Sequence, residues 1–456
     1  MNTPLSLSTT VTLIAHRAGL HAGRDNEVEV LVRIDAPDMP AGHVAQRPLQ
    51  ALALVIDRSG SMQGHPLDEA KRCAAYVVGQ LRPTDKVSLV QFDNRVRRLW
   101  PAVPLGDGAA LREAIAAIHS GGQTNLHGGW LEGADSLRDV GGSGLKRVIL
   151  LSDGQANAGL TDPVAIAAQC TQQAAQGVTT STYGLGRGFN EDLMVAMARA
   201  GGGNHYYGDT AEDLMDPFQQ ELELLGNLCL RELHLSVDLP GGVTVKMIND
   251  LPRADGGWRM LDLTWGAQAW AVLRLTVPAA ALPAAGQWLS LLQVSMRGRT
   301  LDGEAVTLER TSLALRVLPP DAFSQLAEDD TVARRLVELA AADALTRMRQ
   351  AAFDSDWVRV DDLLQRATLD FADNDWVAAV LDAMKAVANS RSRERMMKES
   401  MYSSAKMRSR LTSRDEDQGF SAAQGEAATP SYLRRKSAQG KAAPGADRGG
   451  DDPAKR

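Results

Sequence analysis

Cysteine is scarce in this chain of 456 residues, which has only Cys73, Cys170 and Cys229. An odd number of widely spaced cysteines does not indicate a disulfide framework and is typical of reduced thiols. We therefore expect buried, unreactive thiols. The N-terminal residues also lack the basic start and the sustained apolar core of a secretory leader. Both absences favour a cytoplasmic protein.

Long apolar runs and an excess of basic residues are absent as well. No run approaches the roughly 20 apolar residues that a membrane-spanning helix needs. The formal net charge is -7, which argues against general nucleic-acid binding. The remaining composition, 44% hydrophobic and 23% charged, is typical of globular proteins, and the length suits roughly two to four domains.

The pattern of strands and helices changes three times along the chain. Strand-like runs at 8–15 and 27–35 come first. From 49 to 225, short apolar strands then alternate with amphipathic helices, which is typical of parallel β-α-β units whose sheet is buried on both faces. Strands separated by Pro and Gly turns follow at 228–318, and amphipathic helices follow at 321–410.

This order predicts a fold class and five segments. We expect an α/β domain with a doubly wound, mostly parallel sheet at 47–226, inserted in a β-sandwich. The sandwich would combine strands from 1–46 with those of 227–319, and a helical region would span 320–412. Residues 413–456 contain few large apolar side chains and are expected to be a disordered tail.

A buried strand in the α/β region ends in polar residues. The stretch ALALVIDRSGSMQG at 51–64 places Asp57, Ser59 and Ser61 at alternate positions, so an extended backbone directs three oxygen groups to one side. Gly60 lets the chain bend sharply there. Open α/β sheets bind ligands at the carboxyl edge of their strands, which is where these residues would lie.

Two further segments should reach the same edge. Thr124 lies in the Gly-rich stretch HSGGQTNLHGGW, and Asp153 follows the apolar strand RVILLS and precedes a Gly. The combined set is two carboxylates and three hydroxyls, without a soft ligand. Such a set suits a hard divalent cation, Mg²⁺ first, with Mn²⁺ or Ca²⁺ as alternatives.

These residues resemble the metal-ion-dependent adhesion site of the von Willebrand factor A domain. Asp57, Ser59, Ser61, Thr124 and Asp153 match its five ligand positions. The stretches LVQFD, LLSDG and YGLGRGFNEDLMVAMARAGGGNHYY, at 89–93, 150–154 and 183–207, also look like that family. The flanking strands and helices resemble, more weakly, bacterial intracellular proteins that contain this domain inside a sandwich.

The resemblance implies a mechanism. The hydroxyls of Ser59, Ser61 and Thr124 would contact the metal directly, and Asp57 and Asp153 would act mostly through bound water. Neutral ligands leave the charge of the cation largely uncompensated, so the open position would attract an Asp or Glu of a partner protein. The implied function is a metal-dependent interaction module and not an enzyme, with AAA+ ATPases as the implied partner class.

Two other functions use the same edge of the sheet. A metal-dependent hydrolase or phosphatase would need a general base, and His65, His119 and His127 are the nearby candidates, although such histidines are usually solvated. A purely structural domain with a vestigial site is disfavoured because all five ligand types are present. The stretches GLGRG at 184–188 and GGSGLK at 141–146 lack the spacing of nucleotide-binding loops. We therefore predict no catalytic residue and no organic cofactor.

A basic segment near the C-terminus has two interpretations. Residues 385–414 contain nine Lys or Arg against two Glu, which indicates either a solvated helical face or a docking segment for an acidic surface. Its methionines, Met396, Met397, Met401 and Met407, could form a partner-binding stripe or pack in a core.

Overall fold

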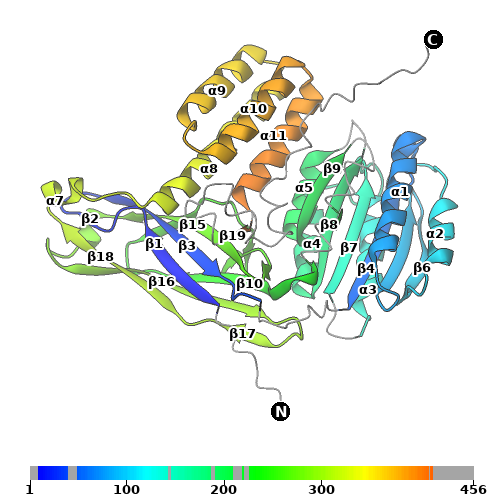
Figure 1. Ribbon diagram of the computed structural model, residues 1–456, viewed down its shortest axis with the longest axis horizontal. Coiled ribbons are helices and arrows are strands. Elements are labelled where there is room, and N and C mark those ends of the chain that lie inside the picture. Colours follow the sequence, from blue (N-terminus) through cyan, green and yellow to red (C-terminus); the bar gives the residue numbers. More distant parts are fainter. Residues whose placement is uncertain are drawn as a thin grey trace, which may run out of the picture.

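The computed structural model describes residues 9–39, 49–141, 145–185, 190–208, 218–219, 225–409 and 411–413. These residues form an α/β domain, a β-sandwich and a helical region, which in Figure 1 lies above the sandwich and to the left of the α/β domain. The predicted fold class is confirmed. The predicted tail at 413–456 lies outside the described residues except for Ser413.

The α/β domain contains a sheet of six strands in the order β6-β5-β4-β7-β8-β9. All neighbours pair in parallel except the edge strand β6, which is antiparallel to β5. The sequence did not reveal β6, because two prolines and three nearby arginines interrupt its apolar pattern. It also did not reveal β9. The strands are β4 (Gln50–Asp57), β5 (Lys86–Phe92), β6 (Val96–Pro104), β7 (Leu145–Ser152), β8 (Val178–Leu185) and β9 (Gly202–Gly208).

Helices cover both faces of this sheet because its strands are apolar on both sides. On β4, Leu52, Leu54 and Ile56 pack against helices α1 and α2 on one face. Ala53 and Val55 pack against α3 on the other face, where α4 and α5 extend the layer. The helices are α1 (His65–Gln80), α2 (Ala109–Ala116), α3 (Leu126–Arg138), α4 (Pro163–Ala175) and α5 (Glu191–Ala200).

The β-sandwich consists of two sheets that enclose one apolar core. One sheet contains β1 (Thr10–Ala15), β3 (Asn26–Asp35), β11 (Thr244–Met247), β15 (Ala267–Val277) and β19 (Thr412–Ser413). The other contains β2 (Leu20–His21), β10 (Leu228–Asp238), β12 (Arg253–Ala254), β13 (Gly257–Arg259), β14 (Leu263–Thr264), β16 (Trp288–Arg299), β17 (Ala305–Thr307) and β18 (Thr311–Leu318).

The α/β domain is inserted between the strands of the sandwich. β3, from before the insertion, pairs along its whole length with β15, from after it, in register from Asp35↔Gln268 to Asn26↔Val277. β19 also pairs with β15, so the chain returns to the sandwich after its last helix. The sequence did not indicate β19, because a two-residue strand has no periodicity of its own.

The helical region packs on the outer face of the smaller sheet. It contains α8 (Asp330–Phe353), α9 (Trp357–Asp370), α10 (Asp375–Asn389) and α11 (Arg393–Arg408). The short helix α7 (Pro320–Ser324) lies instead against β2 of the larger sheet, where Phe323 contacts His21. Val332 and Leu339 of α8 bury the outward side chains Leu31, Trp270 and Val272 of the sheet. This apolar contact fixes the helices to the sandwich.

The charges of the basic segment are largely engaged by the helical region itself. Arg391 pairs with Asp361, and Arg408 pairs with Asp343. Lys406 lies over the ring of Trp376. Met396 and Met407 are buried in the core of the helical bundle. These contacts favour the interpretation of the segment as part of the fold over a free docking surface.

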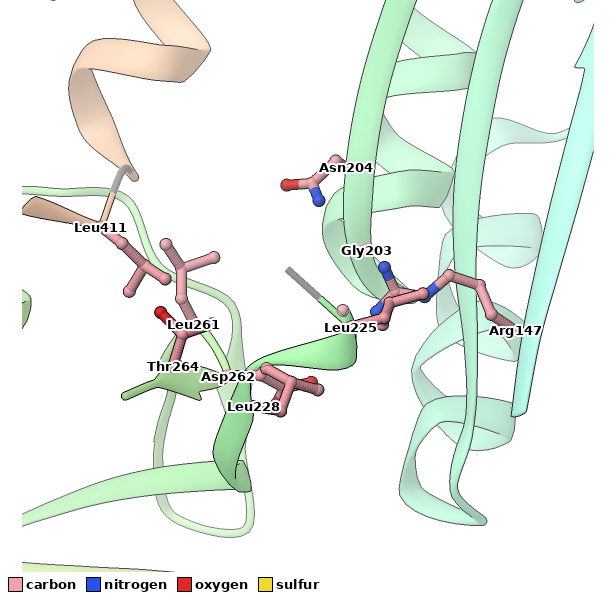
Figure 2. A pocket seen from close by; sticks show the side chains of 10 residues that line it. Arg147, Gly203, Asn204, Leu225, Leu228, Leu261, Asp262, Thr264 and Leu411 are labelled. Carbon is pink, nitrogen blue, oxygen red and sulfur yellow. The ribbon is translucent and has the colours of Figure 1, made fainter. Parts of the chain in front are cut away.

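A small cavity lies where the α/β domain meets the sandwich. Figure 2 shows Arg147 of β7 on one side and Leu261 and Leu411 on the other. Arg147 and Gly202 lie near the amino ends of their strands, so the cavity is at the edge of the sheet opposite to Asp57. It is therefore a feature of the junction between the two units and not the predicted ligand site.

Candidate metal centre

Asp57 is the last residue of β4 and has no exposed surface. Its Oδ1 atom accepts a hydrogen bond from the backbone N–H of Ser59 at 2.9 Å. Its Oδ2 atom accepts one from the hydroxyl of Ser152, the last residue of β7, at 2.5 Å. The carboxylate is therefore held in one orientation by the two central strands of the sheet.

Ser59 and Ser61 follow at the point where the strand turns into a short 3₁₀ helix, Gly60–Met62. Their hydroxyl oxygens lie 3.2 Å apart, but the turn of the chain brings them together, because the extended backbone expected from the sequence ends before Gly60. Ser59 is buried, with 1% of its surface exposed, and Ser61 is exposed. The pair thus extends from the interior of the domain to its surface.

The loop that contains Thr124 lies against these serines. The N–H of Gly60 donates to the carbonyl of Gly122 at 2.8 Å. The N–H of Thr124 donates to the side chain of Asn157 at 2.7 Å, and the carbonyl of Thr124 accepts from the N–H of Asn157 at 3.1 Å. Thr124 is 1% exposed. These bonds join all three predicted segments at one edge of the sheet.

Asp153 follows β7 directly and is 5% exposed. Its carboxylate accepts from the N–H of Gln155 at 3.1 Å, and its carbonyl accepts from the N–H of Asn190 at 2.8 Å. Gly154 adopts a positive φ of 67°, and a Cβ atom there would approach the carbonyl of Asn190 to 3.0 Å. The Gly after Asp153 is therefore required by the turn.

Burial raises the pKa of Asp57 to about 7, although hydrogen bonds from Ser152 and Ser59 oppose the rise. The neighbouring carboxylate of Asp153 raises this pKa further. A buried carboxylate next to a second carboxylate is unfavourable in its ionised form unless a cation or a proton compensates it. The electrostatics of the edge therefore suit a bound cation.

The chemistry of the donors fits a hard divalent cation. Each of the five predicted residues offers oxygen, and no sulfur or imidazole lies among them. Within the described part of the chain, no group of three or more His, Cys, Asp or Glu side chains could hold a metal ion. The predicted centre differs from such a group because three of its five residues are hydroxyl side chains.

Four residues that the sequence did not single out hold the site together. Ser152 and Asn157 bond to Asp57 and Thr124, as described above. The guanidinium of Arg58 donates to the carboxylate of Asp93 at 2.6 Å and to the carbonyl of His119 at 3.0 Å. Asp93 directly follows Phe92 of β5, and Phe92 pairs with Asp57 of β4. The strand order, once known, would therefore have indicated that Asp93 lies near Asp57.

The three candidate histidines occupy different environments. His65 is exposed on α1, near Glu69. The imidazole of His127 lies 2.8 Å from the side-chain oxygen of Gln169, and His119 is exposed. The three cysteines are buried, as predicted, and burial raises the pKa of the Cys229 thiol to about 12. The stretch at 184–188 lies mostly outside the described residues.

The α/β domain matches a known family. The family model of the von Willebrand factor type A domain matches residues 51–221, so the chain contains such a domain. The chain is similar to the uncharacterized protein YfbK of Escherichia coli, with 31% identity over 43% of this chain and 35% of that protein. It is also similar to the uncharacterized protein sll0103 of Synechocystis, with 26% identity over 56% of this chain and 59% of that protein. It thus spans less than two thirds of either relative.

Two solved structures share most of the fold. A von Willebrand factor type A protein from Catenulispora acidiphila aligns with a TM-score of 0.67 over 88% of this chain and 98% of its own, at 18% identity. The ArnB paralog VWA2 from Sulfolobus acidocaldarius aligns with a TM-score of 0.58 over 87% of this chain and 99% of its own, at 17% identity. Both alignments extend well beyond the α/β domain.

Proposed function

We propose that the von Willebrand factor type A domain of this chain binds a divalent cation, Mg²⁺ first, through Asp57, Ser59, Ser61, Thr124 and Asp153. The bound cation would capture an Asp or Glu side chain of a partner protein. Domains of this type are generally metal-dependent protein-interaction modules. The chain would act as an interaction module and not as an enzyme.

One observation above all supports this proposal. Three segments far apart in the sequence bring two carboxylates and three hydroxyls to the carboxyl edge of one sheet, and backbone hydrogen bonds join the segments. Ordinary strand-to-helix turns do not need a buried carboxylate with a raised pKa. A cation would relieve the cost of burying Asp57.

The residues of the site would divide the work. Ser59, Ser61 and Thr124 would donate hydroxyl lone pairs, and Asp57 and Asp153 would orient bound water. When bound, the cation supplies positive charge and an open position for a carboxylate. Ser152 holds the Asp57 carboxylate, and Asn157 holds the Thr124 loop. The exposed Ser61 marks the side from which a partner would approach.

The partner class follows only from the resemblance stated above, and the cellular place follows from the few, widely spaced cysteines. We propose an AAA+ ATPase as the partner and the cytoplasm as the location. No described helix is long and apolar enough to cross a membrane. The sandwich and the helical region would provide a scaffold and a second contact surface.

Metal titration by calorimetry tests the site. Wild-type protein should bind Mg²⁺ and Mn²⁺ at one site, and Thr124→Ala should weaken both by at least about tenfold, since about 1.4 kcal/mol of lost interaction corresponds to that factor. Thr84→Ala is the matched control, because Thr84 is exposed on the loop before β5, at the other edge of the sheet. Equal affinities of wild type and Thr124→Ala would refute the ligand assignment.

A co-purification experiment tests the role as an interaction module. The same tagged variants would be compared with and without EDTA. A partner retained by wild type and by Thr84→Ala, and lost with Thr124→Ala or EDTA, is the expected result. EDTA should add little to the loss caused by Thr124→Ala, because both remove one contact. Metal-dependent turnover of phosphate esters by the wild type that is lost with Thr124→Ala would instead favour a hydrolase.

A further inference from the structure

The register of the sheet places a basic strand end beside the candidate metal centre. Asp57 of β4 pairs with Phe92 of β5, and Phe92 pairs with Val96 of β6. Val96 is therefore two strands away from Asp57, which is about 10 Å at the usual spacing of strands. Arg95 and Arg97 flank Val96 at this same carboxyl end of the sheet.

The loop before β6 also contacts the loops of the metal centre. A Cβ atom on Gly122 would lie 2.8 Å from the side-chain oxygen of Asn94, and Gly122 bonds to Gly60, between the two serines. The carboxylate of Asp93 accepts from the N–H of Arg95 at 2.7 Å and from Arg58. The surface therefore continues without interruption from the serines to Arg95.

Two of the arginines on this side have no acidic partner among the described residues. Arg58 pairs with Asp93, and Arg98 pairs with Glu132. Arg95 and Arg97 are exposed, and no acidic side chain of the described residues forms an ion pair with either. Two positive charges are thus available to a molecule that binds at the metal centre.

Within the described residues, acidic side chains lie on the opposite side of the metal centre. Asp153 lies there, and the loop that follows it ends in the exposed Asp162. A second negative charge on a bound segment would be attracted toward β6 and repelled from the loop of Asp153. An acidic segment that crosses the centre should therefore run toward β6. Exposed charges interact over roughly 8–10 Å at physiological salt, which is about the distance from Asp57 to Val96.

We propose that the partner presents two acidic residues in one extended segment. The first would fill the open metal position, and the second would contact Arg95 and Arg97. An extended chain advances roughly 3.3 Å per residue and directs alternate side chains to one face, so two acidic side chains that both face the domain across about 10 Å would be about two or four positions apart. This inference rests on the proposed function and adds a specificity determinant to it.

Peptide binding tests this inference. Two fluorescent Gly/Ser peptides would be compared by anisotropy in the presence of Mg²⁺, one with a single Glu and one with a second Glu about two or four positions away, on the same face of the extended segment. The second Glu should tighten binding to the wild type by about two- to tenfold, since two exposed ion pairs contribute in this range. The gain should shrink as salt rises.

The variant Arg95→Gln/Arg97→Gln should bind both peptides equally while keeping the wild-type affinity for Mg²⁺. Arg347→Gln/Arg359→Gln, which removes two exposed arginines from α8 and α9, is the matched control and should keep the gain. Equal binding of both peptides to the wild type would overturn the inference. A gain in affinity that survives in Arg95→Gln/Arg97→Gln would overturn it too. Neither outcome would contradict the proposed function. Binding of both peptides that EDTA leaves unchanged would contradict the proposed function itself.

Discussion

The α/β domain and the β-sandwich bury comparable apolar cores, but they assemble from the chain in different ways. All described strands of the α/β domain lie between Gln50 and Gly208, and each crossover is local. The sandwich instead combines strands from 10–35, 228–318 and 412–413. Its central pair, β3 and β15, joins residues separated by the whole inserted domain. The insertion therefore makes the sandwich dependent on both ends of the chain.

The two units also use buried polar groups differently. In the sandwich, the side chain of Asn249 accepts from the N–H of Val272 at 2.6 Å and donates to the carbonyl of Arg408 at 2.9 Å. The amide of Asn249 thus supplies hydrogen bonds to two backbone groups that a neighbouring strand would otherwise supply. In the α/β domain, burial leaves Asp57 with a raised pKa beside a second carboxylate. The comparison separates a buried polar group that completes the fold, Asn249, from one for which we propose a bound cation, Asp57.

Deleting residues 1–46 should cause the largest loss of stability, and the loss should fall on the sandwich and not on the α/β domain. β3 supplies Val28, Val30, Val32 and Ile34 to the sandwich core, and loss of four buried aliphatic side chains costs on the order of 10 kcal/mol. This equals the whole stability of a typical domain, so the sandwich should unfold or aggregate. Residues 47–226 expressed alone should remain soluble and unfold cooperatively. A truncated chain that stays monomeric with an unchanged melting curve would refute the interdependence.

Replacing Asn249 with Ala should cause the second largest loss. The N–H of Val272 and the carbonyl of Arg408 would lose their partners, and a buried unsatisfied group costs about 1–3 kcal/mol. Urea denaturation should show this loss, together with faster amide exchange in β15 and at the end of α11. Gln293→Ala is the control, since the side chain of Gln293 makes a single, exposed hydrogen bond of 3.4 Å within the part of the chain that the structure describes. Equal midpoints for the two variants would contradict this role of Asn249.

His205 should make the α/β domain sensitive to acid, whereas the raised pKa of Asp57 acts in the opposite direction over the same pH range. Burial lowers the pKa of His205 to about 3, and its Nδ1 atom lies 2.9 Å from the hydroxyl of Thr182. The unfolded imidazole binds a proton near pH 6.5 and the folded one does not. Below pH 6.5 the unfolded state therefore holds more protons, and the free energy of unfolding falls by up to about 1 kcal/mol per pH unit.

Melting curves between pH 7 and 5 check this prediction. His205→Asn should gain stability relative to the wild type as the pH falls, because the amide does not titrate and can still donate a hydrogen bond to Thr182. His65→Asn, at an exposed histidine, should keep the wild-type slope. Parallel curves for wild type and His205→Asn would assign the acid sensitivity to other groups.

The smallest effect is expected at the contact between the α/β domain and the helical region. Arg349 of α8 pairs with Asp192 of α5 at 2.6 Å, and Asp192 is largely exposed. Exposed ion pairs contribute about 0–1 kcal/mol, so Arg349→Ala should shift the melting temperature by only a few degrees. A much larger shift would show that the helical region is held as strongly by the α/β domain as by the sandwich.

Much of the fold and of the site could be predicted from local patterns. The buried strands and the helices of the α/β domain follow from their periodicity, and side-chain caps explain where the last helices begin. Asp329, Asp356, Asn374 and Ser392 each accept a backbone hydrogen bond at the start of a helix. The five site residues were predicted from polar residues at strand ends, from a Gly-rich loop and from a family resemblance. Their roles as metal ligands stay predictions.

The remaining features depend on contacts that no local pattern encodes. β6 was missed because edge strands tolerate proline and charge, yet β6 places Arg95 and Arg97 beside the site. Ser152 is ordinary in sequence, and only the pairing of β4 with β7 brings its hydroxyl to Asp57. The same holds for Arg58 and Asp93, which meet across adjacent strand ends.

The sequence by itself determined the order of the three units, the apolar strands and helices, and the chemistry of the polar strand ends, because these depend on residue type and on periodicity over a few residues. The tertiary structure alone decided which strand ends are neighbours, that Arg95 and Arg97 lie beside the site, and that the chain returns through β19 to the sandwich. Strand order and register depend on how much apolar surface distant segments bury when they pack together. The pattern of one segment does not specify which partner it packs against.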